Sequence, residues 1–136
     1  MGLKRIVLRD FVIVSELDLD LESGFSVLTG ETGAGKSILI DALQLVTGAR
    51  ADTGMIREGA VRTDVSAEFD APEATQLFLA EAGFDGGHVV LLRRTVDAQG
   101  KSRAWVNGSP ATAQQLRTLG EQLLDIHGQQ LFAKGA

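Results

Sequence analysis

The segment Gly-Glu-Thr-Gly-Ala-Gly-Lys-Ser at residues 30–37 constrains this chain more than any other feature. It matches the pattern G-x-x-x-x-G-K-[ST], in which glycines let the backbone curl so that successive N–H groups point at an anion. Residues 25–29 form a short apolar run before it, and residues 38–46 form an apolar run after it that ends near Gly48. These runs predict a buried strand and a buried helix. Strand, glycine-rich loop and helix in this order predict a phosphate-binding loop (P-loop).

Each position of the loop has an expected part in holding a nucleoside triphosphate. The residues expected to bind it are Gly30, Glu31, Thr32, Gly33, Ala34, Gly35, Lys36 and Ser37. The helix that we expect to start near Lys36 adds the partial positive charge of its first amides. The Lys36 ammonium is expected to reach the β- and γ-phosphates, and the Ser37 hydroxyl to ligate Mg²⁺. The motif therefore predicts a nucleotide and a magnesium ion as cofactors.

A P-loop alone does not predict hydrolysis, because hydrolysis needs a further acidic residue that follows an apolar strand and holds Mg²⁺. Leu-Leu-Asp at residues 123–125 resembles such a strand end only faintly, since Ile126 continues the apolar run. Two interpretations of Asp125 stay open: a magnesium ligand, or a residue within a strand at 123–127 with a local hydrogen bond. We expect no catalytic residue in these 136 residues, and hence half of an active site.

The remaining pattern predicts an α/β fold rich in hairpins. Predicted strands lie at residues 3–9, 16–22, 25–29, 61–69, 89–96, 101–106 and 123–127, and predicted helices at 38–46, 70–82 and 112–121. The segment 16–22 alternates leucine with carboxylate residues, which is typical of an antiparallel strand with one face in water.

Two local signals refine the predicted helices. Asp70 with Glu73, and Thr112 with Gln115, each match a capping box at a helix start. The helix at 38–46 is apolar on nearly every side, so we expect it to lie between two sheet layers.

Composition narrows the class of protein. The chain has 44% hydrophobic and 23% charged residues, which is typical of one folded domain or part of a larger one. It has no cysteine, which excludes disulfides and thiolate metal sites. No apolar run approaches the ~20 residues of a membrane span, so we expect a cytoplasmic protein without membrane contact. A net charge of −5 has the wrong sign for a dedicated nucleic-acid-binding module.

One predicted hairpin, at residues 89–106, nevertheless gathers basic side chains. They are Arg93, Arg94, Lys101 and Arg103. Such a cluster can contact DNA phosphates, or it can be a solvated hairpin face with cross-strand pairs. The second interpretation is favoured because Arg93 and Arg94 are neighbours on one strand and point to opposite sides. Trp105, the single tryptophan, is expected in the core and not on a base-stacking surface.

Two stretches of the chain resemble the SMC family of ABC-type ATPases. One spans residues 27–43 around the P-loop, and the other is Leu-Asp-Ile-His-Gly-Gln at 124–129. The resemblance covers essentially the whole chain. It implies an α/β P-loop NTPase fold: the N-terminal lobe of an ABC/SMC-type head, with antiparallel hairpins beside a sheet packed on the P-loop helix. Residues 1–136 are then one partial domain, with the coiled coil, signature motif and C-terminal lobe further along.

The resemblance also implies roles for residues outside the P-loop. Gln129 corresponds to the Q-loop glutamine that ligates Mg²⁺ and senses the γ-phosphate, with Gln130 as the less favoured match and a polar strand-end residue as the alternative. Arg57 lies where an arginine often contacts phosphate in SMC heads, with Arg50 as its rival and a solvated loop arginine as the alternative. Residues 130–134 do not reproduce the His-x-His-Gln pattern of the family.

The function implied by the resemblance is ATP-driven engagement of two heads in DNA double-strand break repair and recombination. Implied partners are ATP, the C-terminal lobe of the same protein, a second head in a homodimer, and DNA at the nucleoid through the full-length protein. This lobe alone is expected to turn over almost no ATP. Two alternatives stay open: a self-contained P-loop small-molecule kinase that uses Asp125 for Mg²⁺, or a nucleotide-regulated binding module.

Overall fold

The computed structural model describes residues 3–20, 33–84 and 87–123, with the side chains of α1 described from Ile38 onward. The strands are β1 (Leu3–Phe11), β2 (Val14–Asp20), β3 (Arg62–Asp70), β4 (Val89–Asp97), β5 (Ser102–Val106) and β6 (Ser109–Ala111). The helices are α1 (Gly33–Val46), the short 3₁₀ helix η2 (Thr53–Met55), α2 (Glu73–Ala82) and α3 (Ala113–Leu123). The predicted strands at 25–29 and 123–127 fall largely or wholly outside the described residues.

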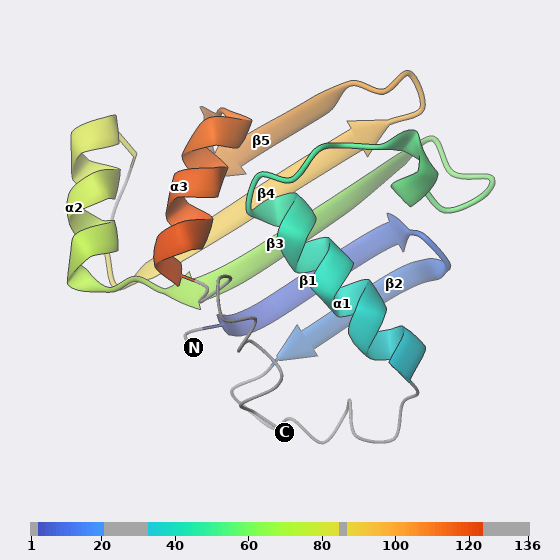
Figure 1. Ribbon diagram of the computed structural model, residues 1–136, viewed down its shortest axis with the longest axis horizontal. Helices are drawn as coiled ribbons and strands as arrows, with labels where there is room; N and C mark the ends of the chain where they lie inside the picture. The colour runs from blue at the N-terminus through green and yellow to red at the C-terminus, as the bar shows by residue number, and fades with distance from the viewer. Residues whose placement is uncertain (1–2, 21–32, 85–86, 124–136) are drawn as a thin grey trace.

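The described strands form one sheet with the order β2-β1-β3-β4-β5-β6, and every neighbouring pair is antiparallel. Helices α1 and α3 lie side by side across one face of this sheet, with α2 beside α3 (Figure 1). The last strand, β6, was not predicted, because Pro110 and the turn at Asn107 and Gly108 indicate only a loop. A proline is tolerated there since β6 is an edge strand of the described sheet.

Strict alternation along β3 shows how the sheet divides into two faces. Thr63, Val65, Ala67 and Phe69 are buried beneath the helices, while the residues between them are more exposed. The same alternation continues in the neighbouring strands, because their register aligns buried residues with buried residues. The core therefore fills the space between one sheet face and α1 and α3.

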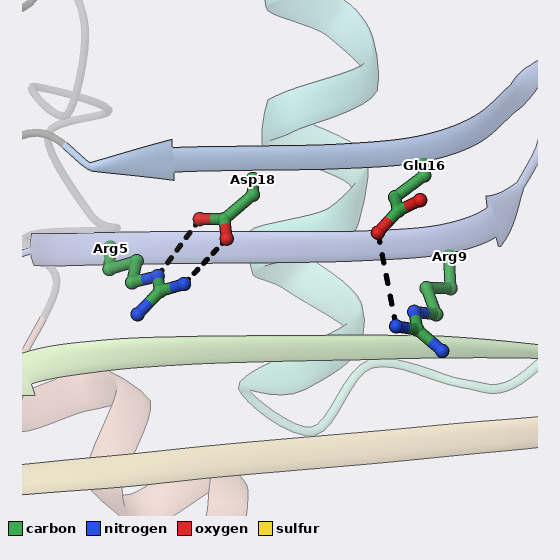
Figure 2. Close-up of polar contacts among 4 residues, drawn as sticks. All are labelled: Arg5, Arg9, Glu16 and Asp18. Atoms are coloured by element: carbon green, nitrogen blue, oxygen red, sulfur yellow. Dashed lines mark hydrogen bonds and ion pairs between the residues drawn. The ribbon is translucent and has the colours of Figure 1, made fainter.

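The other face carries charged side chains in ion pairs. Figure 2 shows two of them between β1 and β2: the Arg5 guanidinium donates from Nε to Asp18 Oδ1 at 2.8 Å, and Arg9 Nη2 lies 3.8 Å from Glu16 Oε2. We call this surface the open face. The predicted solvated carboxylate face of the strand at 16–22 is thus confirmed for its described residues.

Helix α1 differs from its prediction in where it begins. It begins at Gly33, three residues before the expected start near Lys36. The prediction that it lies between two sheet layers stays a prediction, because the predicted strands at 25–29 and 123–127 fall largely or wholly outside the described residues. On the described part of the helix, Leu43 and Leu45 are buried, whereas Asp41 and Gln44 are exposed.

Of the two predicted capping boxes, one is confirmed and one is wrong. Thr112 Oγ1 accepts from the Gln115 amide at 3.0 Å, and Gln115 Oε1 accepts from the Thr112 amide at 2.9 Å. Asp70 does not cap α2, because β3 continues through it in register with Val89. The residue at the cap position is Pro72, which makes no side-chain cap bond.

Candidate nucleotide-binding site

The N-terminal end of α1 lies inside the P-loop motif. Because α1 begins at Gly33, the last five motif residues form its first turns, and the first four N–H groups of any α-helix have no partner within the helix. The first turn contains no acidic residue, so no side-chain carboxylate of that turn opposes a bound anion. This helix end has the backbone polarity that a phosphate requires.

Several predicted site residues lie where the structure gives no side chain. Gly30, Glu31 and Thr32 lie outside the described residues, as do Asp125 and Gln129. Gly33, Ala34, Gly35, Lys36 and Ser37 are described only as helical backbone. Their roles therefore stay predictions.

The two candidate arginines lie in different places. Arg57 follows η2 and is held to the end of β1: its amide donates to the Asp10 carbonyl at 2.8 Å, and its Nη1 lies 3.6 Å from Asp10 Oδ1. Arg50 follows the C-terminal end of α1, whose 14 residues span about 21 Å. Arg50 thus lies one helix length from the P-loop end of α1. The choice between Arg57 and Arg50 as the phosphate contact stays a prediction.

The C-terminal end of α1 is held by a buried cation from β4. The Arg94 side chain, 4% exposed, donates from Nη1 to the carbonyl oxygens of Leu45 at 2.8 Å and Ala49 at 2.7 Å. Its Nε donates to Ser102 Oγ on β5 at 2.8 Å. Burial, and secondarily the charge of Arg117, lowers the pKa of Arg94. A guanidinium at the negative end of a helix dipole is favourable, which offsets part of this burial cost.

Helix α3 meets the same end of α1 at backbone contact distance. A Cβ added at Gly48 would lie 2.7 Å from the Ala113 carbonyl oxygen, and one added at Gly120 would lie 2.5 Å from Thr47 Cβ. Arg117 Nη2 also donates to the Gly48 carbonyl at 3.3 Å. Because β4 and α3 both bind this end, the direction of α1, and hence of its P-loop end, is constrained by the packing at residues 45–49.

This role of Arg94 was not predicted from the sequence. A signal was present, because Arg94 takes the inward position of the alternating strand β4, in line with the buried Val90, Leu92 and Val96. An arginine in such a row must find polar partners inside the protein.

The basic hairpin residues divide between the two faces, as predicted for Arg93 and Arg94. Arg93 lies on the open face, where its Nε donates to Asp64 Oδ1 at 3.1 Å, and its guanidinium carbon lies 4.7 Å from the centre of the Trp105 ring. The prediction that Trp105 belongs to the core is wrong: it is half-buried under Arg93, because the alternation of β5 turns Ala104 and Val106 inward.

The described residues contain no group of three or more His, Asp or Glu side chains able to hold a metal ion. None of the described helices has the length and apolar character needed to cross a membrane.

Known proteins resemble the chain in sequence. It is 43% identical over 129 residues to the DNA repair protein RecN of Xylella fastidiosa, and 39% identical over 130 residues to that of Bacillus subtilis. Both alignments cover 93% of this chain and 23% of the relative, so the chain spans about a quarter of the length of these relatives.

Solved structures share the fold. A structure from a study of ATP-driven dimerization and DNA-stimulated activation of SMC ATPases matches with a TM-score of 0.67 at 23% identity, covering 89% of this chain and 78% of that one. The SMC head domain from Thermotoga maritima matches with a TM-score of 0.58 at 22% identity, covering 88% of this chain and 42% of that one. The predicted α/β fold of an SMC-type head lobe is thus confirmed.

The sequence family described as "AAA domain" matches residues 5–130, nearly the whole chain. The chain therefore belongs to the AAA domain family.

Proposed function

We propose that this chain is the ATP-binding N-terminal lobe of an SMC-like ATPase head that acts in DNA double-strand break repair and recombination. The observation that carries the proposal is the start of α1 inside the motif Gly-x-x-x-x-Gly-Lys-Ser, with no carboxylate in the first turn. The likeness to RecN over 93% of the chain supports DNA repair as the setting.

In this proposal the backbone of residues 30–35 and the first amides of α1 hold the phosphates of ATP. Lys36 places its ammonium at the β- and γ-phosphates, and Arg57 supplies a second cation. The anchored C-terminal end of α1 keeps these amides in place, since Arg94 ties Leu45 and Ala49 to the sheet. Binding therefore depends on both ends of one helix.

Mg²⁺ fits the donors that the proposal assigns to it. A hydroxyl from Ser37 and an amide oxygen from Gln129 are oxygen ligands, which Mg²⁺ prefers. A bound Mg²⁺ would neutralise charge between the β- and γ-phosphates.

Turnover in this proposal needs parts beyond residues 1–136. The C-terminal lobe of the same protein and a second head of a homodimer complete the site, so ATP joins two protomers. The lobe by itself is then nearly inactive, and DNA and the nucleoid are reached through the full-length protein. The γ-phosphate provides the differential affinity that such a switch requires.

The kinase alternative is not favoured, because every described strand pairing is antiparallel, whereas that class has a mostly parallel sheet. A nucleotide-regulated binding module that lacks turnover differs from the proposal only in its rate of hydrolysis. Steady-state ATP hydrolysis by the intact protein separates such a module from an ATPase.

The test measures ATP binding, ATP-dependent dimerisation and steady-state hydrolysis in the intact protein that contains this chain. Lys36→Ala is expected to abolish all three. Lys101→Ala is the matched control, because it removes an exposed lysine on the β4–β5 turn and should leave all three unchanged in the absence of DNA.

Wild-type protein that binds ATP and dimerises but never hydrolyses it would identify the binding module. Unchanged ATP binding by Lys36→Ala would refute the proposed site. The separate prediction for the lobe fails if the purified 136-residue chain hydrolyses ATP at the rate of the intact protein and loses that activity with Lys36→Ala.

A further inference from the structure

We propose that the open face carries a binding site for the phosphate backbone of DNA, formed by cations at the ends of β3, β4 and β5. The choice of DNA as the polyanion rests on the proposed function, whereas the site itself rests on the geometry and charge of described residues. It lies on the face opposite α1, so it is separate from the P-loop.

The site is a hollow of about 350 Å³. Its lining includes Arg62 of β3, Arg93 of β4, Lys101 of the β4–β5 turn, and Arg103 and Trp105 of β5. These cations come together from positions up to 41 residues apart in a chain whose net charge is −5. The hollow is therefore locally basic although the chain as a whole is acidic.

Three of these cations have no carboxylate partner in the part of the chain that the structure describes. The fourth, Arg93, is paired with Asp64, and elsewhere on the open face Arg5 and Arg9 are paired with Asp18 and Glu16.

Within the described residues, Arg62, Lys101 and Arg103 make no ion pair, and all three are exposed. The carboxylate in the lining, Asp97, is engaged by the turn: its Oδ1 accepts from the amides of Gln99 at 3.0 Å and Lys101 at 2.9 Å. Three cations are thus available to a ligand, while Asp97, which faces Arg62 across β3 and β4, keeps its negative charge in the lining.

The spread of the cations suits a row of phosphates. Arg62 and Arg103 lie on β3 and β5, which flank β4 on either side. Neighbouring strands lie about 4.8 Å apart, so the two backbones are separated by roughly 10 Å. A nucleic-acid backbone offers phosphates at several points across such a span, and each contact releases condensed counterions.

The indole in the hollow points to sequence-independent binding. The Arg93 guanidinium covers the Trp105 ring at 4.7 Å and is itself tied to Asp64. That ring face is therefore occupied by a cation and is not free to stack on a base. Phosphate contacts without base contacts carry no sequence information.

The test measures affinity of the intact protein for a DNA duplex, by fluorescence anisotropy over a series of salt concentrations. The triple variant Arg62→Gln, Lys101→Gln and Arg103→Gln is expected to flatten the slope of log K against log salt by about 2–3, since each lost phosphate contact removes about 0.9. The three single variants should each flatten it by about 1. Changing the base sequence of the duplex should alter neither wild type nor variant.

The matched control carries the same change in net charge: Arg5→Gln, Arg9→Gln and Arg50→Gln. Two of these arginines lie in ion pairs on the open face, so the control should keep the wild-type slope. If both triple variants keep the wild-type slope of log K against log salt, the proposal is overturned. It is also overturned if both variants flatten that slope equally, because the effect then depends on net charge alone. If the triple variant does not fold, the single variants decide by the same criterion.

ATP binding without DNA separates this inference from the proposed function. The open-face variants should bind ATP as wild type does. If the wild-type protein binds no ATP, but the triple variant still flattens the slope of log K against log salt, the nucleotide site is refuted and the phosphate site is supported.

Discussion

Arg94 of β4 donates a hydrogen bond to the carbonyl oxygen of Leu45, 49 residues away, and so ties the sheet to the end of the P-loop helix. The same nitrogen also reaches the Ala49 carbonyl at 2.7 Å, just beyond that helix. The described residues give Arg94 no carboxylate partner. The helix end itself thus serves as the counter-charge of a buried guanidinium.

Replacing Arg94 with methionine should loosen this helix end. Two carbonyl oxygens and the Ser102 hydroxyl lose a charged donor, at a cost of about 1–3 kcal/mol. In the intact protein, amide hydrogen exchange at residues 44–49 should accelerate about tenfold to a hundredfold, and ATP affinity should fall.

Arg93→Met is the matched control for Arg94→Met. It removes the neighbouring arginine, whose partners lie on the open face, so exchange at residues 44–49 should stay at the wild-type rate. Equal acceleration in both variants would contradict the assigned role of Arg94.

Gly48→Ala should destabilise the protein more than Gly83→Ala. Both glycines follow a helix and have positive φ, +103° and +86°, so each alanine carries a backbone strain of about 1–2 kcal/mol. At Gly48 the new Cβ would also meet the Ala113 carbonyl oxygen at 2.7 Å, whereas nothing lies within 4 Å of a Cβ at Gly83. Overpacking adds about 1–3 kcal/mol at Gly48 alone. Thermal melting of the two variants measures the difference. Equal melting temperatures would show that α3 shifts to make room for the new Cβ at no cost in stability.

Thr112→Ala should destabilise α3 by about 1 kcal/mol, because it removes the acceptor of the Gln115 amide. Asp70→Ala should have a smaller effect, since Asp70 caps no helix and its carboxylate lies 3.5 Å from Lys4 Nζ in an exposed ion pair. Denaturant titration of both variants checks this order. If Asp70→Ala lowers the free energy of unfolding more than Thr112→Ala does, the capping box predicted at Asp70 and Glu73 forms after all.

The Arg5–Asp18 pair should make a contribution that depends on pH. The hydrogen bond from Arg5 lowers the pKa of Asp18 below its ordinary value. A carboxyl with a lowered pKa in the folded state stabilises that state above the ordinary Asp pKa, and this contribution is lost as pH falls through the lowered value. Arg5→Gln should return the pKa of Asp18 toward its ordinary value. NMR titration of labelled aspartate carboxyl carbons measures this, and an unchanged midpoint would contradict it.

Local patterns were sufficient where the determining contacts are local. The alternation in β2 and β3, the capping box at Thr112 and Gln115, and the glycine that ends α2 at Gly83 all act within a few residues. The P-loop motif likewise predicts a helix at its end, and α1 begins inside it.

Predictions from the sequence failed where contacts with residues distant in the sequence determine the local structure. Asp70 has the sequence of a helix cap, but its pairing with Val89 extends β3 through it. Trp105 has the character of a core residue, but the register of β5 with β4 turns it toward Arg93 on the open face.

The sequence by itself determined the phosphate-binding motif and most of the elements, because spacing and periodicity are properties of neighbouring residues, and its resemblance to the SMC family implied the lobe of an SMC-type head. Only the tertiary structure decided that Arg94 holds the end of α1 and that Arg62 and Arg103 share one hollow. Both depend on strand register, which brings together residues up to 49 positions apart and is set by packing of the whole sheet.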